Sequence, residues 1–336
     1  MKYPKITNKK VLVTGGAGFI GSNLCKSLLE HENKVICLDN LATGKKENIE
    51  TLLPHPDFEF LEGDIRDLDT CLKATSDVDL VLHQAALGSV PRSINDPLTT
   101  NSVNITGFLN MLEAAKNNRV ERFIYAASSS TYGDSKELPK VEEHIGKPLS
   151  PYAVTKYVNE LYAKVFSDLY GIKVIGLRYF NVFGRNQDPD GAYAAAIPKF
   201  IKTFINHQSP EIYGDGTQTR DFTYIDNVIQ ANHLAGTTQN NHAFNEVYNV
   251  AFGENYTLNQ IIQKIKELLS KYDRAIMNIP VKYAPPRKGD IKHSLASIEK
   301  AKKNLGYNPS HSVIQGLEEA IDWYWQYFHQ KAKQNA

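Results

Sequence analysis

Short apolar runs alternate with helical patterns along the first half of the chain. Six runs rich in β-branched and aromatic residues predict strands. They lie at 10–14, 34–38, 58–61, 78–82, 122–127 and 172–178. Apolar residues at helical spacing predict helices between them. These helices lie at 19–29, about 67–75, about 97–118 and 150–169. Strands that alternate with helices in this way form a parallel sheet with helices on both faces.

The pattern loosens after residue 180. Turn-rich stretches lie at 184–192, 213–220 and 284–290. Between them the sequence predicts a helix, a short strand followed by a helix, and two amphipathic helices. These lie at 197–206, 222–236, 257–270 and 313–329. The expected fold class is therefore α/β, with a doubly wound parallel sheet and a smaller α/β domain towards the C-terminus.

Composition and charge exclude several classes of protein. A chain of 336 residues suggests about two domains. Lys plus Arg is 38 and Asp plus Glu is 37, which argues against binding to nucleic acid or an anionic membrane. No apolar run approaches the ~20 residues of a membrane span, and no apolar segment follows the basic N-terminus as in a secretory signal. Cys25, Cys37 and Cys71 are scattered, so neither disulfides nor a metal site is expected. We predict a cytoplasmic protein.

A glycine-rich turn joins the first predicted strand to the first helix. Residues 14–22 read TGGAGFIGS, with Gly15, Gly18 and Gly21 in register. Such a turn lets a pyrophosphate approach the backbone at a helix N-terminus. Asp39 ends the second strand, where a carboxylate can bind ribose hydroxyls and repel a 2′-phosphate. The pattern favours NAD over NADP, although a tight structural turn beside an unrelated acid is the alternative.

Tyr152 and Lys156 lie four residues apart at the start of a predicted helix, so their side chains share a face. A nearby ammonium is expected to lower the pKa of a tyrosine towards neutrality. The pair could then act as a general base for an alcohol or sugar hydroxyl. The same spacing recurs at 132/136 and 327/331, but only the pair at 152/156 follows the fifth strand at a capped helix start.

Three serines, at 128–130, directly follow the fifth strand. Ligands of open α/β sheets bind beyond the carboxyl ends of the strands. A hydroxyl group there can bind a sugar oxygen and relay its proton. The alternative is a polar strand end capped by its own side chains.

Nine segments together carry a resemblance to a known family. They are TGGAGFIG (14–21), GDIRD (63–67), HQAA (83–86), GSVPRS (88–93), SSSTYGD (128–134), SPYAVTKYVNE (150–160), LRYFNVFG (177–184), GDGTQTRDFTYI (214–225) and RKGD (287–290). Over essentially its whole length the chain resembles the extended short-chain dehydrogenase/reductase family. It looks most similar to the UDP-N-acetylhexosamine 4-epimerases of bacterial O-antigen and capsule pathways.

The resemblance implies a Rossmann-type fold with an interleaved second domain. The nucleotide domain would span 1–180, with 217–250 returning to it, and the substrate domain would span 181–216 and 251–330. It also implies a homodimer formed through the helices at 97–118 and 150–170.

The resemblance assigns the cofactor NAD to a specific set of residues. These are Gly15, Gly18, Phe19, Ile20, Gly21, Asp39, Asn40, Asp64, Ile65, Gln84, Ala85, Ala86, Tyr152, Lys156 and Tyr179. Within this set Asp39 would hold the adenosine ribose, and Asp64 and Ile65 would flank the adenine. Lys156 would bind the nicotinamide ribose.

The resemblance likewise assigns the catalytic and substrate residues. Tyr152 would be the base, Lys156 its tuning group and Ser128 the catalytic serine, with Ser129 as a near second choice. The UDP-sugar would contact Gly88, Ser89, Ser128, Ser129, Ser130, Asn181, Gln187, Ala195, Arg220, Arg287, Asp290 and Ser294. Asn181, Arg220 and Arg287 would hold the diphosphate, because planar guanidinium groups suit phosphate. Ser294 would be the gatekeeper whose small side chain leaves room for an N-acetyl group.

The implied reaction is 4-epimerisation of UDP-N-acetylglucosamine to UDP-N-acetylgalactosamine through a 4-keto sugar, for surface polysaccharide such as lipopolysaccharide. Dehydration is disfavoured, because Ser129 and Ser130 stand where dehydratases of the family carry an Asp-Glu pair. UDP-N-acetylglucosaminuronate is an alternative substrate, with Arg92 as a candidate partner for its carboxylate, and UDP-glucose is another. An NAD-binding regulator without catalytic activity is the alternative from a different class.

Overall fold

The centre of the molecule is one parallel sheet of seven strands, in the order β11-β6-β5-β4-β1-β2-β3. The computed structural model describes residues 3–190, 194–286 and 292–334. The strands are β1 (Lys10–Thr14), β2 (Lys34–Asp39), β3 (Phe58–Glu62), β4 (Leu80–His83), β5 (Arg122–Ser128), β6 (Lys173–Tyr179) and β11 (Glu246–Val250). All pair in parallel. The prediction of a doubly wound Rossmann-type sheet is confirmed, and so are all six strands expected from the sequence.

The sequence analysis missed the seventh strand, β11. Its sequence EVYNV contains Glu246 and Asn249, which break the apolar pattern of a buried strand. Asn249 is nevertheless fully buried, and its side chain is satisfied by hydrogen bonds from other segments. Pairing with β6 and these tertiary contacts, rather than local pattern, make this segment a strand.

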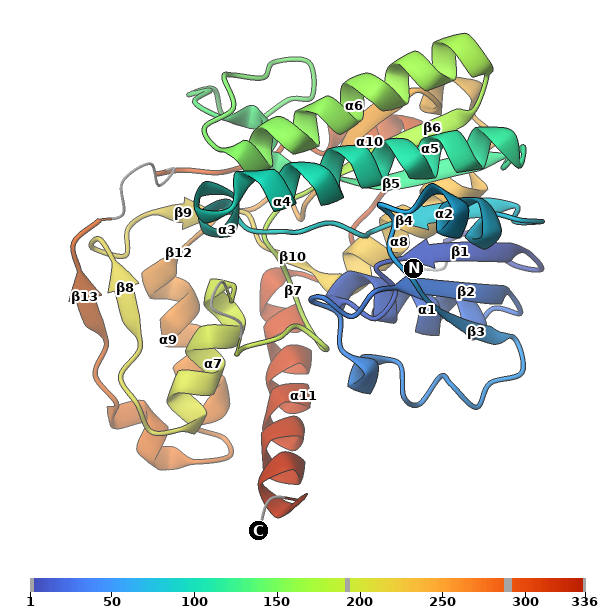
Figure 1. Ribbon diagram of the computed structural model, residues 1–336. Coiled ribbons are helices and arrows are strands. Elements are labelled where there is room, and N and C mark those ends of the chain that lie inside the picture. Colours follow the sequence, from blue (N-terminus) through green and yellow to red (C-terminus); the bar gives the residue numbers. More distant parts are fainter. Residues whose placement is uncertain (1–2, 191–193, 287–291, 335–336) are drawn as a thin grey trace.

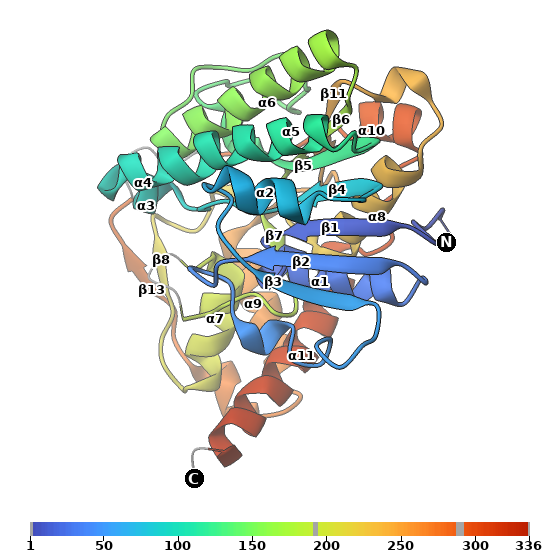
Figure 2. The same cartoon turned by 45° about the vertical axis from the view of Figure 1, so that its right-hand side comes forward.

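Helices cover both faces of the sheet, as Figures 1 and 2 show. Val11 and Val13 pack with α1 (Phe19–Leu29) and α8 (Ile225–Thr237) on one face. Leu12, between them, packs on the other face with α2 (Leu68–Ala74), α5 (Phe108–Asn117) and α6 (Pro151–Tyr170). Successive side chains of a strand point to opposite faces, so one strand supplies both cores. α10 (Glu299–Leu305) lies beside β11.

The long helix expected at 97–118 is interrupted. It comprises α4 (Pro97–Asn101), a π-helical turn η2 (Ser102–Gly107) and α5. Such π-turns are rare in proteins overall, and those that occur often lie at functional sites. A short helix, α3 (Val90–Asn95), precedes it and was not expected.

The second part of the molecule is smaller and built from short elements. Its helices are α7 (Ala196–Ile205), α9 (Leu258–Leu269) and α11 (Val313–Gln334). Its strand pairs are β7 (Val182–Phe183) with β10 (Thr223–Tyr224), β9 (Thr219–Arg220) with β12 (Tyr256–Thr257), and β8 (Glu211–Tyr213) with β13 (Lys282–Ala284). The stretch at 213–220, expected to be a loop, therefore contains a strand, β9.

Short helical turns lie elsewhere along the chain. They are η1 (Lys46–Asn48), η3 (Ser129–Tyr132), η4 (Asn241–Ala243) and η5 (Arg274–Asn278).

The two parts share one apolar core. The cluster that packs α1 and α8 against the sheet continues into α7, α9 and α11. β10 leads directly into α8, and β11 adds to the large sheet, so the chain returns to the first part after α7. The exact domain boundaries stay a prediction. Within the described ranges, no helix combines the length and apolarity needed to cross a membrane.

Candidate active site

A cavity of about 510 Å³ lies at the carboxyl ends of β1, β2 and β4. Most of the residues predicted to bind NAD line it, together with three predicted substrate residues. These are Gly15, Gly18, Phe19, Ile20, Gly21, Asp39, Asn40, Asp64, Ile65, Gln84, Ala85, Ala86, Gly88, Gln187 and Ala195. The structure thus brings the glycine turn, the acid at the end of β2 and the HQAA segment to one site.

The glycine turn leaves no room for side chains. A Cβ on Gly21 would lie 2.1 Å from the carbonyl oxygen of Gly15, and one on Gly15 would lie 2.8 Å from the backbone of Ala85. Gly15 also has a φ of +66°, which favours glycine. The amide of Gly18 donates to the carbonyl of Gly15 at 3.0 Å, which closes the turn ahead of α1. This bare backbone at a helix N-terminus fits the pyrophosphate of NAD.

Two carboxylates line the adenosine side of the cavity. Asp39 is buried and accepts hydrogen bonds from the backbone amides of Ala17 and Leu41, at 3.0 and 2.8 Å. Burial raises its pKa, and the two amides oppose that rise. Asp64 pairs with Arg66 at 2.6 Å, and hydrogen bonds from that guanidinium hold its pKa at about 2. Both residues line the cavity, and their contacts with the ribose and the adenine stay a prediction.

The predicted catalytic group forms where β5 meets the start of α6. The Ser128 hydroxyl lies close enough to Tyr152 to lower the pKa of the tyrosine. Lys156 is buried, and its Nζ donates to the carbonyl of Ala126 at 2.8 Å. These residues do not line the cavity itself. They lie beside its HQAA wall, because β4 and β5 are neighbours in the sheet.

One electrostatic expectation is wrong. Lys156 was expected to lower the pKa of Tyr152, but burial raises it, and only the Ser128 hydroxyl opposes that rise. The physical reason is that the ammonium is turned towards a backbone carbonyl on β5. Burial also lowers the pKa of Lys156 itself to about 8, against the opposing effect of Glu160.

The geometry separates the two candidate serines. Ser128 ends β5 and accepts hydrogen bonds from the Oγ and the backbone amide of Ser130, at 2.9 and 3.2 Å. Ser129 begins η3. Of the two, Ser128 is the serine that affects the pKa of Tyr152.

Buried amide side chains connect the cavity wall to the catalytic helix. Asn104, in the π-turn, exchanges hydrogen bonds with the backbone of Leu87 and donates to Thr155 at 3.1 Å. The Tyr179 hydroxyl donates to Gln84 at 3.2 Å and accepts from Asn232 at 2.9 Å. Sequence reasoning missed both asparagines, because each acts through contacts between distant segments.

The predicted substrate residues divide into two groups. Gly88, Gln187 and Ala195 line the cavity, and the Oε1 of Gln187 is buried without a hydrogen-bond partner. Such an atom can accept a hydrogen bond from a ligand. Ser89, Asn181, Arg220 and Ser294 lie outside the cavity. Arg287 and Asp290 lie outside the described residues.

Arg220 and Ser294 lie on neighbouring segments. The Ser294 amide donates to the carbonyl of Thr219 at 3.2 Å, one residue before Arg220. Asn181 has a positive φ of 37°, and its Nδ2 donates to the carbonyl of Asp221 at 2.9 Å. The structure therefore brings these three predicted residues together around β9.

Further residues at the cavity were not expected from sequence. Polar examples are Thr43, Lys45, Asn48, Arg66, Asn186 and Asp188. Lys45 pairs with Asp188 at 2.9 Å, which links the loop after β2 to the segment before α7. Arg92, considered for a uronate substrate, also lines the cavity. These loop residues carry no pattern that distinguishes them from surface polar groups.

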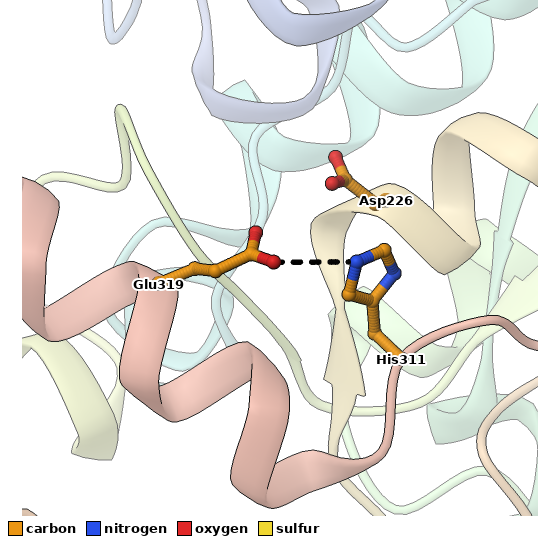
Figure 3. A group of neighbouring side chains, drawn as sticks. All are labelled: Asp226, His311 and Glu319. Carbon is orange, nitrogen blue, oxygen red and sulfur yellow. Dashed lines mark ion pairs between the residues drawn. The ribbon is translucent and has the colours of Figure 1, made fainter.

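Away from the cavity, Asp226, His311 and Glu319 have ligand atoms close enough together to hold a metal ion (Figure 3). Their groups already have other partners. Arg185 donates to Asp226 at 2.6 Å, and the Tyr224 hydroxyl donates to Glu319 at 2.8 Å. We interpret the group as an ion-pair network that joins α8 to α11.

Comparison with known proteins agrees with this geometry. The model of the NAD dependent epimerase/dehydratase family matches residues 11–251. The chain belongs to this family, and its cofactor is NAD.

Three solved structures illustrate the similarity. One is the UDP-N-acetylglucosamine 4-epimerase from Methanobrevibacter ruminantium, in complex with UDP-N-acetylmuramic acid. It is 40% identical in sequence, with a TM-score of 0.89, and the match covers 96% of this chain and 100% of that one. UDP-glucose 4-epimerase from Thermotoga maritima, with UDP-glucose, is 36% identical, with a TM-score of 0.87 over 95% and 99%. UDP-glucuronic acid 4-epimerase from Bacillus cereus, with UDP-glucuronic acid and NAD, is 35% identical, with a TM-score of 0.85 over 95% and 99%.

Proposed function

We propose that this protein interconverts UDP-N-acetylglucosamine and UDP-N-acetylgalactosamine by epimerisation at C4. The observation that supports the proposal is the nearness of Ser128 to Tyr152, beside the cavity that the glycine turn and Asp39 line. Similarity to three UDP-sugar 4-epimerases over nearly the whole chain supports the wider class of activity, NAD-dependent 4-epimerisation of a UDP-sugar. The proposed destination of the product, a surface polysaccharide, rests on sequence resemblance alone.

The chain's own residues would move a proton at the C4 oxygen. Tyr152 accepts the C4 hydroxyl proton as general base, and Ser128 donates a hydrogen bond that stabilises the tyrosinate. When bound, NAD supplies reversible oxidation at C4, so the net redox change is zero. Tyr152 returns the proton after the sugar has turned its other face. Lys156 would hold the ribose of the nicotinamide nucleotide when NAD is bound.

The N-acetylated substrate is proposed because of Ser294 and the similarity to a UDP-N-acetylglucosamine 4-epimerase. Ser294 lies next to the segment that carries Arg220, the candidate diphosphate ligand. A serine there leaves space that a larger side chain would fill.

The variant Ser294→Tyr tests this specificity. We expect it to abolish turnover of UDP-N-acetylglucosamine and to spare UDP-glucose, because the tyrosine ring would occupy the N-acetyl space. Ser294→Ala is the matched control and should turn over both sugars. An equal loss on both substrates in Ser294→Tyr would contradict the gatekeeper role.

A second candidate substrate is UDP-N-acetylglucosaminuronate. Arg92 lines the cavity, and a guanidinium group there could pair with the carboxylate at C6. Assays of the four UDP-sugars, with and without N-acetyl and carboxylate groups, distinguish this candidate from the first.

We also propose that the protein is a homodimer. The outer faces of α4 and α6 expose Leu98, Leu161, Val165 and Leu169, which are 82, 49, 48 and 68% exposed. A row of exposed apolar side chains on adjacent helices is typical of a protein–protein interface. These are the helices that the sequence resemblance assigns to the dimer contact.

A further inference from the structure

Glu160 is a buried carboxylate that the proposed mechanism does not use. It lies four residues after Lys156 on α6, so the two side chains share one face of the helix. Its side chain is only 6% exposed. A buried carboxylate one turn from a proposed catalytic lysine needs a physical explanation.

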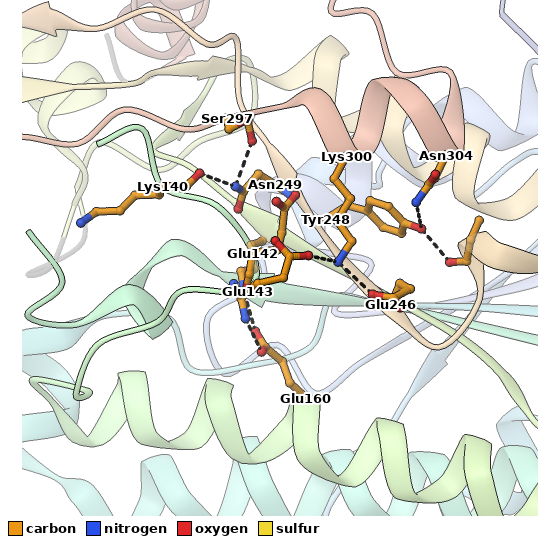
Figure 4. Close-up of polar contacts among 12 residues, drawn as sticks. Lys140, Glu142, Glu143, Glu160, Glu246, Tyr248, Asn249, Ser297, Lys300 and Asn304 are labelled. Carbon is orange, nitrogen blue, oxygen red and sulfur yellow. Dashed lines mark hydrogen bonds and ion pairs between the residues drawn. The ribbon is translucent and has the colours of Figure 1, made fainter. Parts of the chain in front are cut away.

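Arg178 on β6 holds Glu160 in a two-pronged ion pair (Figure 4 shows the Glu160 end). Its Nε donates to Oε1 at 2.9 Å and its Nη2 donates to Oε2 at 2.7 Å. The third guanidinium nitrogen, Nη1, donates to the carbonyl of Glu142 at 2.9 Å. The ring of Tyr132 lies 4.9 Å from the guanidinium carbon. The carboxylate of Glu160 therefore has little freedom to move.

The ion pair lies directly beside the catalytic group. Arg178 pairs in register with Ala127 of β5, the residue before Ser128. On the same strand, the carbonyl of Ala126 accepts the hydrogen bond from Lys156. The pair thus joins α6 to β6, the strand next to β5.

Stability alone is a weak reason for this pair. Burying two charges costs about as much as their attraction returns, and apolar residues of equal volume often serve as well. A negative charge near Lys156 has a second effect, because it favours the ammonium form. Burial lowers the pKa of Lys156 to about 8, and Glu160 opposes that fall.

The other groups around Lys156 do not replace this negative charge. His83 on β4 is buried, and burial lowers its pKa to about 3, so it is neutral. Tyr125 on β5 is buried, and burial raises its pKa well above the usual value. Arg178 on β6 is positive, and Arg92 on α3 lines the cavity. Within the described part of the chain, Glu160 is the carboxylate that acts on Lys156.

We propose that Glu160, held by Arg178, is a positioning residue that keeps Lys156 an ammonium ion during catalysis. This inference rests on the proposed function, in which Lys156 contacts the cofactor.

The test measures the pH dependence of NAD affinity and of kcat, between pH 6 and 9.5, in the full-length protein. NAD binding needs no sugar, so it reports on Lys156 even if the proposed substrate is wrong. In Glu160→Gln we expect the alkaline loss of NAD affinity and kcat to begin about one pH unit lower than in the unmodified protein. Glu160→Asp retains the charge and should keep the original profile.

A double variant separates charge from stability. Glu160→Gln alone leaves Arg178 buried without a counter-ion, which can prevent folding. In Glu160→Gln/Arg178→Gln no unpaired charge remains, so we expect the protein to fold. Its NAD affinity and kcat should still fall at a lower pH than in the unmodified protein. An unshifted limb in the folded double variant would overturn the proposal and leave the pair a structural one. Failure of the proposed function is a different result, in which the unmodified protein binds NAD and converts no UDP-sugar.

Discussion

At the scale of single residues, the chemistry depends on a contact between two hydroxyl groups. Tyr152 and Ser128 come from a helix and a strand separated by a 22-residue stretch, 129–150, and meet because α6 packs over the end of β5. Burial raises the pKa of the tyrosine in the structure, and the Ser128 hydroxyl opposes that rise. This dependence makes the tyrosine hydroxyl the most informative atom to remove.

We expect Tyr152→Phe to lower kcat by about 10²–10⁴-fold, because it removes the general base. NAD content and the melting temperature should change little, since the ring is retained. Tyr157→Phe on the same helix is the matched control and should keep full activity. The measurement is turnover of UDP-N-acetylglucosamine, and near-normal turnover in Tyr152→Phe would contradict the assigned role.

Gly21→Ala tests the glycine turn. Its Cβ would lie 2.1 Å from the carbonyl oxygen of Gly15, so the turn must shift to accept it. We expect loss of most NAD binding, measured by titration of the cofactor. Gly18→Ala is the graded comparison, because its Cβ would lie 3.1 Å from the same oxygen and should weaken binding less. Equal, unchanged affinity in both variants would show that the turn does not hold the pyrophosphate.

Sequence could predict the residues whose type and local spacing carry the chemistry. The glycine turn, Asp39 and the Tyr152–Lys156 pair are of this kind, and the structure places the turn and Asp39 at the cavity. It could not predict the direction of the Tyr152 pKa shift, because that depends on where the lysine ammonium points. Nor could it predict Asn104, because its role follows from contacts with Leu87 and Thr155.

At the scale of elements, strand β11 supplies a polar junction that local pattern conceals. Asn249 donates to the carbonyls of Lys140 and Ser297, both at 3.0 Å, and accepts from the Tyr132 hydroxyl at 2.7 Å (Figure 4 shows the first two). Ser297 lies close in sequence to the candidate gatekeeper Ser294. One buried side chain therefore joins the segment after Ser128 to the segment that would face the sugar in the proposed function.

Asn249→Ala should destabilise the protein by about 3 kcal/mol, since it removes three hydrogen bonds worth roughly 1 kcal/mol each. We also expect a higher KM for the UDP-sugar, because the segment around 294–297 loses its anchor. Urea unfolding and steady-state kinetics measure the two effects. Asn241→Ala, at an exposed position before the same strand, should change the unfolding free energy by no more than about 0.5 kcal/mol. Equal free energies of unfolding in Asn249→Ala and Asn241→Ala would contradict the stabilising role of Asn249.

At the scale of the whole molecule, the chain leaves the large sheet after β6 and returns to it at β11. Strand and helix patterns predicted the sheet correctly, because consecutive βαβ units are local. The position of β11 at the sheet edge follows from long-range pairing with β6, which apolar periodicity does not encode. The short strands of the smaller part, some only two residues long, carry no pattern of their own.

The proposed dimer gives a prediction at this scale. Leu169→Glu on α6 should shift the protein from dimer to monomer, because a charge would enter an apolar contact. Light scattering coupled to size exclusion measures the mass. Leu53→Glu, at an exposed leucine outside the predicted interface, is the control and should remain dimeric. A monomeric unmodified protein would contradict the dimer outright.

One measurement tests directly whether the protein 4-epimerises an N-acetylated UDP-sugar with a cofactor that stays bound. The purified protein is mixed with UDP-N-acetylglucosamine and no added NAD, and the anomeric proton signals are followed by NMR. We expect UDP-N-acetylgalactosamine signals to appear and to reach a constant ratio to the substrate, and Tyr152→Phe to produce none. Persistence of the substrate signals alone, in a preparation shown to contain bound NAD, would contradict the claim.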